Sequence, residues 1–279
     1  VWIRIKEKWS ILNTQTGELN TPNYDGKAAG GVNTAFCIYN NDLYTFIGQK
    51  VYRFNYAKNE FVFCLTLPDS DGNIRFARAY MGKLWIFVNN SGLYKIDMST
   101  FKIEDHYTLL TDYEGNSLRT FYIDKKGYIW FGTIDGIYIF DPTDGKLSHY
   151  KHSRTDPFSL PNNSIWEISE DRQSNVWIGT YSGTLCYVNI DENNAFKTYH
   201  PQNSGLNHTP VSAFAEDQQY LWVGTEGGGI NRMNKATGEF SYITSANSIT
   251  SNNIKSLITD AGHNLWISTF MGGLDLYNV

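Results

Sequence analysis

Residues 128–142 read YIWFGTIDGIYIFDP, and this stretch decides the fold. It holds two runs rich in β-branched and aromatic residues on either side of a short turn with Asp135 and Gly136, a pattern typical of paired β-strands. Four near-copies occur in the chain: KLWIFVNNSGLYKID at 83–97, NVWIGTYSGTLCYVN at 175–189, YLWVGTEGGGINRMN at 220–234 and NLWISTFMGGLDLYN at 264–278. The chain is therefore built from an internal repeat.

The spacing of the repeat indicates its architecture. The central tryptophans of the five copies follow one another at intervals of 45, 47, 45 and 44 residues, at Trp85, Trp130, Trp177, Trp222 and Trp266. Two weaker copies precede them, DLYTFIGQKVYRFN around Tyr44 and VWIRIKEKWSILN around Trp2. This is the period of a four-stranded propeller blade. We predict an all-β fold, a β-propeller of about seven four-stranded blades that forms a single domain over residues 1–279.

One blade can be divided into its strands from the sequence. Around Trp177 we expect strands at 164–170, 175–180, 183–190 and 195–199, separated by short runs of turn-forming residues. No long apolar stripe of helical period is present, so helices should be nearly absent. The first copy begins at its second strand and the last ends after its third. We therefore expect incomplete terminal blades and a piece of a longer polypeptide.

Three residues recur at fixed places in the blade. The tryptophan should pack between neighbouring blades. A glycine after the second strand should occupy a tight turn with positive φ, and an aspartate at the end of the first strand should accept hydrogen bonds from turn amides. The glycines are Gly136, Gly183, Gly228 and Gly273, and the aspartates are Asp124, Asp171, Asp217 and Asp260.

Composition excludes several classes of function. The formal net charge is -5, and no run of lysine and arginine could neutralise a phosphate backbone, so nucleic acid is not an expected partner. No stretch approaches 18 apolar residues and no signal peptide is recognisable, so we expect no membrane contact within this sequence. Cys37, Cys64 and Cys186 lack metal-binding spacing and lie in apolar runs, so we expect buried thiols and no metal or other cofactor.

The repeats resemble those of a known family. Their core, D-x-x-(G/S/H)-x-(L/V/I)-W-(I/V/F)-G-T-x-x-G, and the phrase DPFSLPNNSI at 156–165 are similar to the two-component regulator propeller repeats. Such repeats form the sensor region of hybrid two-component systems in gut Bacteroidetes. The resemblance is strongest from Gly115 to Val279 and weakens before Ala79, where Gly-Thr is lost.

The resemblance implies a function. It suggests a periplasmic sensor propeller that responds to an oligosaccharide and signals transcriptional control of glycan use. It also implies further modules outside this sequence: a second propeller, a β-sandwich, a membrane helix, a histidine kinase and a regulator module. The expected partners are a neutral or anionic oligosaccharide, the second propeller and a partner protomer. We expect no enzymatic activity in this chain itself.

A candidate ligand site lies on the innermost strands. Five positions before the terminal aspartate, the repeats differ strongly, whereas the position two later is uniformly apolar. Variation beside uniformity is what a site on a repetitive scaffold would show. The variable column contains Arg119, Trp166, Ser212 and Lys255, with Arg75 and Thr34 from earlier copies; Tyr181, Glu226 and Phe270 follow the second strands. An aromatic platform with cationic donors suits a sugar that carries carboxylate or sulfate.

Two other classes of function compete with this interpretation. A propeller lyase of the streptogramin type needs a metal-supported pair of histidines at the channel mouth, and the variable column contains no histidine. The six histidines also form no HxH or HExxH spacing. A protein-interaction or dimerisation scaffold is the second alternative, because interfaces and sugar sites both favour exposed aromatic residues and arginine.

Overall fold

The computed structural model describes residues 2–5, 8–13, 15–24, 27–28, 35–68, 74–110, 118–181, 184–189 and 193–279. All regular structure in these ranges is β-strand. No helix long and apolar enough to cross a bilayer occurs in them. The strands form seven sheets within the described residues, six of them built only from neighbours in sequence, and the fold is the predicted seven-bladed β-propeller. By its contacts the chain divides into two compact units, 1–116 and 117–279.

The first unit contains three blades. The first blade has three strands, β1 (Trp2–Ile5), β2 (Lys8–Leu12) and β3 (Leu19–Asn20). The second has six strands in the order β5-β4-β9-β8-β7-β6: β4 (Asn23–Tyr24), β5 (Lys27–Ala28), β6 (Phe36–Tyr39), β7 (Asp42–Ile47), β8 (Lys50–Asn55) and β9 (Glu60–Thr66). The third consists of β10 (Ile74–Tyr80), β11 (Lys83–Val88), β12 (Gly92–Asp97) and β13 (Ile103–Tyr107).

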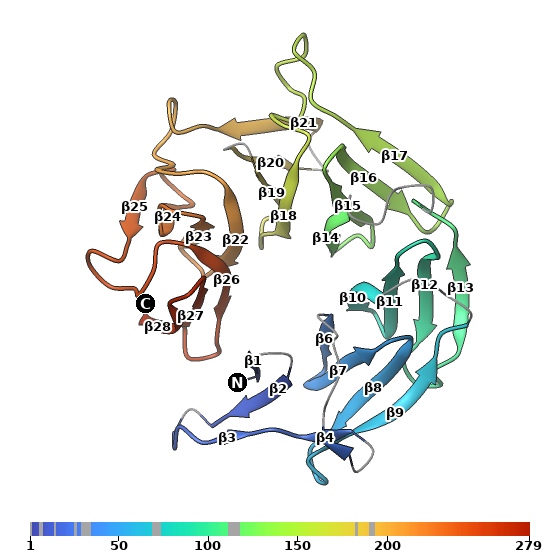
Figure 1. Cartoon of the computed structure of the whole chain (residues 1–279). Coiled ribbons are helices and arrows are strands. Elements are labelled where there is room, and N and C mark those ends of the chain that lie inside the picture. Colours follow the sequence, from blue (N-terminus) through green and yellow to red (C-terminus); the bar gives the residue numbers. More distant parts are fainter. Residues whose placement is uncertain are drawn as a thin grey trace. The chain divides into compact units, whose positions relative to one another are not determined.

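The second unit contains four blades. The fourth consists of β14 (Leu118–Ile123), β15 (Ile129–Thr133), β16 (Gly136–Asp141) and β17 (Lys146–Tyr150), and the fifth of β18 (Ile165–Glu170), β19 (Asn175–Thr180), β20 (Leu185–Asn189) and β21 (Asn193–Tyr199). The sixth consists of β22 (Val211–Glu216), β23 (Tyr220–Thr225), β24 (Ile230–Asn234) and β25 (Phe240–Ile243). The seventh has β26 (Ile254–Thr259), β27 (Asn264–Thr269) and β28 (Gly273–Asn278). The first strands of these blades lie beside one another on the inner side (Figure 1).

The strands agree with the sequence analysis in most places. In the fifth blade the four observed strands coincide with the four predicted ones to within two residues at their described ends. The first and last blades have three strands each, as expected for incomplete terminal blades. The short strands β4 and β5 were not predicted; β4 pairs in parallel with β9 of the second blade. The assignment of residues 1–279 to one domain stays a prediction.

The tryptophans pack between blades, as predicted. Trp130 and Trp222 are almost completely buried, and Trp85 and Trp177 are nearly so. Trp130 belongs to a hydrophobic cluster that continues into the fifth blade through Ile165 and Val176. Trp266, in the last blade, is half-buried. Cys37 and Cys186 are buried and Cys64 is half-buried, and all three are free thiols.

The recurrent aspartate ties a turn to the tryptophan. Asp171 accepts hydrogen bonds through Oδ1 from the backbone amides of Gln173 and Asn175, both at 2.9 Å, which is the predicted role. Its Oδ2 accepts the indole N–H of Trp177 at 2.7 Å, which was not predicted. The same indole bond recurs from Trp130 to Asp124, Trp222 to Asp217 and Trp266 to Asp260, at 2.8, 2.9 and 2.9 Å.

The glycines after the second strands are only partly as predicted. Gly136 and Gly273 have the predicted positive φ of 106° and 89°. The assignment of Gly228 was wrong: its neighbours Gly227 and Gly229 have positive φ, and Gly228 instead allows close approach to the side chain of His208. Gly183 lies outside the described residues.

Candidate functional site

Every described residue of the variable column lies at a β-bulge. In β14, Leu118 pairs with Thr133 and Thr120 with Gly132, so Arg119 is the extra residue. The same register shift isolates one residue near the start of β10, β18, β22 and β26: Arg75, Trp166, Ser212 and Lys255. A bulge leaves one residue out of the ladder and redirects its side chain, and bulges are common beside functional sites.

A glycine opposite the bulge brings neighbouring blades together. Gly132, Gly179 and Gly224 are the glycines of the Gly-Thr pair on the second strands. A Cβ at Gly132 would lie 2.7 Å from Cγ2 of Ile165, in the first strand of the next blade. The glycine therefore allows one bulge to approach the next, and this explains why the repeat contains glycine inside a strand.

The threonine after that glycine fixes the loop that follows the second strand. Oγ1 of Thr133 donates to the carbonyl oxygen of Gly136 at 2.9 Å and accepts the amide of Asp135 at 2.9 Å. Thr225 makes the corresponding bond to the carbonyl of Gly229 at 3.0 Å. These loops begin where the bulges lie, because the bulged end of each first strand pairs with the end of the second. The Gly-Thr pair thus fixes the backbone on which the candidate residues are carried.

Arg119, Trp166 and Tyr181 form one cluster, which we call the arginine cluster. The guanidinium of Arg119 lies 4.6 Å from the ring centre of Trp166 and 5.7 Å from that of Tyr181. The two rings lie 5.3 Å apart at an angle of 31°. Tyr181 is 51% exposed. Arg119 forms no ion pair with the part of the chain that the structure describes.

Lys255, Glu226 and Phe270 form a second group, in the sixth and seventh blades. The ammonium of Lys255 pairs with the carboxylate of Glu226. It also lies 5.5 Å from the ring centre of Phe270, which is 51% exposed. Because the charge of Lys255 is compensated within the chain, this group offers less attraction for an anion than the arginine cluster.

The remaining candidates are placed differently. Ser212 is buried, and its hydroxyl donates to the carbonyl oxygens of Ile254 at 2.7 Å and Gly224 at 3.2 Å, so it joins the sixth blade to the seventh. Arg75 is half-buried at the bulge of β10, where its guanidinium lies 5.9 Å from the ring centre of Phe76. Thr34 lies outside the described residues. Of the column, only Arg119 and Trp166 meet in one cluster within the second unit.

A family model of known proteins matches two of these repeats. The model of the "two component regulator propeller" family matches residues 112–135 and 159–182, which contain Arg119, Trp166 and Tyr181. Two stretches of this chain are thus similar to two-component regulator propeller repeats. The resemblance seen in the repeats is thereby confirmed.

The chain is similar to parts of larger proteins. Histidine kinase P4 of Formosa agariphila is 28% identical over 252 residues, which cover 83% of this chain and 18% of that protein. The extracellular domain of a hybrid two-component system of B. thetaiotaomicron has a TM-score of 0.53 and 20% identity, over 99% of this chain and 44% of that one. PorZ, a surface component of the type-IX secretion system of Porphyromonas gingivalis, has a TM-score of 0.69 and 16% identity, over 87% and 38%. The chain thus spans less than half of each.

The sequence did not reveal two features of this repeat. It did not show that the variable column coincides with bulges, because a bulge is defined by pairing with another strand. It also did not reveal a cavity between the fourth and fifth blades, lined by Tyr128, Tyr150 and Phe196 among others. A second cavity, lined by Trp177, Tyr187 and Tyr199 among others, lies between the fifth and sixth blades. Whether side chains of neighbouring blades leave a space between them depends on how the blades pack, which the repeat pattern does not specify.

Proposed function

We propose that this chain is the ligand-sensing propeller of a two-component signalling protein, that it lies outside the cytoplasm, and that the arginine cluster binds an oligosaccharide carrying carboxylate or sulfate. In this role the chain performs no catalysis. Support for a sensing role comes from relatives that are a histidine kinase and the extracellular domain of a hybrid two-component system. The periplasm and a glycan ligand are part of the proposal.

The observation that carries the ligand class is the geometry of Arg119. Its guanidinium lies against the faces of two aromatic rings and has no ion-pair partner in the described residues. An arginine stacked through its face keeps its N–H edge available, and that edge matches a carboxylate or sulfate in a two-pronged hydrogen bond. Tyr181, half-exposed beside it, offers a ring on which a sugar can stack.

Signalling requires that the ligand favour one arrangement of the protein over another. Only the difference in affinity between the arrangements can shift their populations. Blades stabilised by paired strands and buried tryptophans favour motion of whole bodies over deformation within a blade. The further modules and the partner protomer that such motion would act on belong to the complete protein.

The test is calorimetric titration with matched oligosaccharides. Unsaturated chondroitin sulfate disaccharides and oligogalacturonides supply the anionic ligands, and chitobiose and cellobiose supply neutral ones. We expect an anionic ligand to bind, and R119A to weaken it at least about tenfold, the effect of losing a charge-assisted hydrogen bond. R119K should retain part of the affinity, and K255A, at the compensated group, should change it little.

Two results would refute the proposal. One is that no anionic oligosaccharide binds to well-folded protein. The other is that binding occurs but K255A weakens it as much as R119A does, because the arginine cluster would then have no special role.

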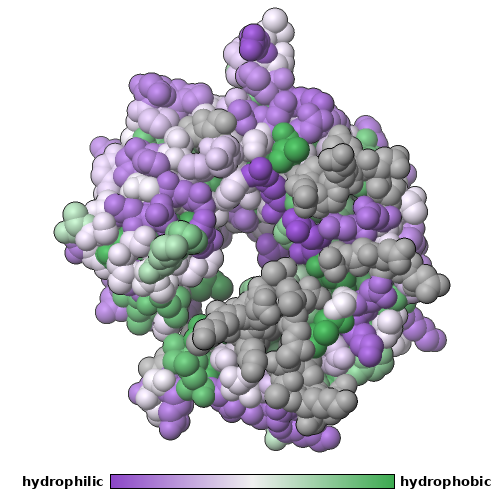
Figure 2. All heavy atoms as spheres, viewed as in Figure 1, coloured by the Kyte–Doolittle hydropathy of each residue, from purple (hydrophilic) through white to green (hydrophobic). Residues whose placement is uncertain are grey.

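A second candidate function is a protein-interaction surface, favoured by exposed apolar side chains on the last blade. Ile258, Met271, Leu274 and Leu276 are between 41% and 92% exposed. Figure 2 shows hydrophobic surface over this blade, at the left of the view. A surface of this kind commonly marks an interface. Light scattering over a concentration series tests it: self-association that is lost in I258D would support an interface, and a monomer at all concentrations would count against pairing of this chain with itself.

A further inference from the structure

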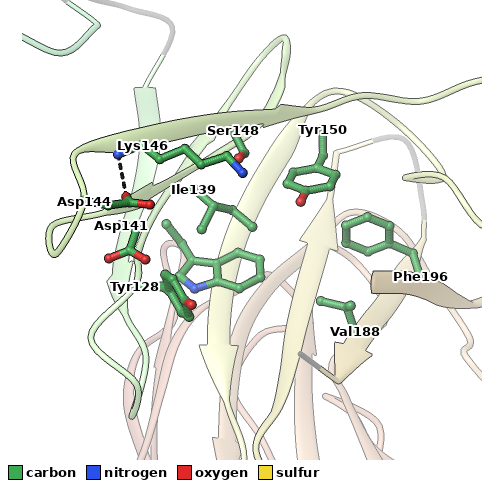
Figure 3. Close-up of a pocket in the computed structure, with 10 residues that line it drawn as sticks. Tyr128, Ile139, Asp141, Asp144, Lys146, Ser148, Tyr150, Val188 and Phe196 are labelled. Atoms are coloured by element: carbon green, nitrogen blue, oxygen red, sulfur yellow. Dashed lines mark hydrogen bonds between the residues drawn. The ribbon is translucent and has the colours of Figure 1, made fainter. Parts of the chain in front are cut away.

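A separate cavity lies between the fourth and fifth blades. It has a volume of about 330 Å³ and is lined by eight residues of the fourth blade and by Val188 and Phe196 of the fifth. Figure 3 shows these side chains converging on one space beside the β16–β17 hairpin. None of the residues of the arginine cluster lines it. Its size falls in the range of roughly 300–1,000 Å³ that is typical of small-molecule sites.

The floor of the cavity is apolar. Trp130 lines it together with Ile139, Val188 and Phe196. Trp130 is 1% exposed, and the indole N–H donates to Asp124 at 2.8 Å, so the orientation of the ring is fixed. Trp130 therefore supports the floor from below, and the half-buried Ile139 with the half-buried rings of Tyr128 and Tyr150 supplies the apolar surface that a ring-shaped ligand would contact.

Two carboxylates with unused hydrogen-bonding capacity lie at one side. Oδ1 of Asp141 accepts the amide and hydroxyl of Thr143 at 2.8 and 2.6 Å. Oδ1 of Asp144 accepts the amide of Lys146 at 2.8 Å, the bond drawn in Figure 3. Within the described residues, Oδ2 of each carboxylate has no hydrogen-bond partner. Each can therefore accept a hydroxyl group from a ligand.

Further polar groups complete the lining. The hydroxyl of Tyr150 points toward the centre of the group in Figure 3, and Ser148 lies beside Tyr150 on the same strand, β17. Neither side-chain hydroxyl has a partner in the part of the chain that the structure describes. Lys146 adds three donors. The cavity thus combines an apolar floor with both acceptors and donors, of which the strongest are carboxylate acceptors.

We infer that this cavity is a second ligand site and that it binds a neutral sugar ring. A pyranose presents C–H groups on its faces, which match the floor, and hydroxyls around its rim, which match the acceptors and donors. Two carboxylates against one ammonium leave the lining net negative, so an acidic sugar is repelled. This selectivity is opposite to that of the arginine cluster and does not depend on the function proposed for it.

The space between the fifth and sixth blades provides a matched control. Tyr199 holds the place of Tyr150, since each pairs with the first apolar residue of the third strand. In this neighbouring space the ring of Tyr187 lies beside Trp177, with ring centres 4.7 Å apart at an angle of 38°, where the fourth blade has Ile139. The carboxylate of Asp171, which lines it, is fully used by hydrogen bonds within the protein. It should not bind a neutral sugar in the same way.

The test is saturation-transfer NMR with the methyl glycosides of glucose, galactose and mannose, and with methyl glucuronide as the acidic counterpart. At least one neutral glycoside should give a saturable signal, and the glucuronide should bind at least about tenfold more weakly. D144N keeps the acceptor for the turn amide but removes the charge, and should weaken binding at least about fivefold, as should Y150F. Y199F and R119A should leave binding unchanged.

Three results would overturn the inference. They are the absence of saturable binding by all three neutral glycosides to folded protein, equal or tighter binding of the glucuronide, and binding that Y199F weakens as much as Y150F. Circular dichroism and melting temperature of each variant show whether its fold is intact. The arginine cluster can fail its own titration with anionic oligosaccharides while this site succeeds, so the two proposals are tested separately.

Discussion

Replacing Asp171 with alanine should destabilise the fifth blade far more than loss of an ordinary turn residue. The carboxylate accepts four hydrogen bonds: two from turn amides, one from the side-chain amide of Asn175 and one from the indole of Trp177. Asp171 is 3% exposed and Trp177 is 4% exposed, so water cannot replace the indole bond without rearrangement. A buried donor left unsatisfied costs about 1–3 kcal/mol, and each turn amide adds about 0.5–1.5 kcal/mol. The total is about 2–6 kcal/mol.

The matched control is Asn234→Ala. Oδ1 of Asn234 also accepts two backbone amides, from Ala236 and Thr237, but at the surface and without a tryptophan. The two variants therefore lose the same kind of turn bond and differ in the buried bonds. Urea unfolding followed by tryptophan fluorescence should show D171A losing at least about 1 kcal/mol more than N234A.

A double-mutant cycle with W177F isolates the indole bond. In the D171A background the indole N–H is already unpaired, so W177F should cost less there than in the wild-type protein. If D171A lowers the free energy of unfolding no more than N234A, or if the effects of D171A and W177F are additive, the bond between Asp171 and Trp177 does not hold the blade together and the reasoning fails.

Three further predictions concern pH, backbone approach and thiol reactivity. Hydrogen bonds, first among them the one from Trp266, lower the pKa of Asp260 to about 2. The contribution of this carboxylate to stability is therefore complete above its ordinary pKa of about 4 and is lost as the pH falls toward 2. The stabilities of wild type and D260N should converge in acid unfolding over this interval, and a constant difference between the two would contradict the assignment. G224A places a Cβ 2.6 Å from Cγ2 of Ile254 and should destabilise by about 1–3 kcal/mol, whereas the Cβ of G262A would lie 3.1 Å from Nδ2 of Asn264, at the end of a side chain that can move, and should cost less; equal melting temperatures for G224A and G262A would refute the role given to the glycine. Burial raises the pKa of Cys37 to about 12 and raises the pKa of Cys186 as well. Iodoacetamide at pH 8 should therefore label Cys64 first in the folded protein. Peptide mapping that finds Cys186 labelled equally fast would show that its thiol is accessible.

The architecture could be predicted because it is repetitive. Five copies share a central tryptophan and the same order of strands and turns, so an ambiguous copy such as the one around Tyr44 is interpreted from its neighbours. Where the pattern is absent, prediction failed: β4 and β5 have two residues each, too few for any period to appear. Gly228 was misassigned because three consecutive glycines leave no side chain by which to align the loop with those of other blades.

The candidate site could be predicted only as a column of residues. Comparing repeats identified Arg119 and Trp166, since both stand where neighbouring copies differ. That they touch, while Lys255 pairs with Glu226 and Ser212 bonds to backbone, depends on how each bulge faces the adjacent blade. A bulge is set by the register of two strands, which residue types alone do not specify.

The bulges have a consequence for how such a protein can change. A residue inside a strand must pair with the neighbouring strand, and its side chain must pack in the core. A bulged residue does not pair with the neighbouring strand. At Arg119, Trp166 and Lys255 the side chain also contributes little to the core. Mutation at these places can exchange one chemistry for another while the blades remain intact, so a new specificity can arise by single substitutions. A library confined to Arg119, Trp166 and Lys255 would therefore sample new ligands on an unaltered scaffold.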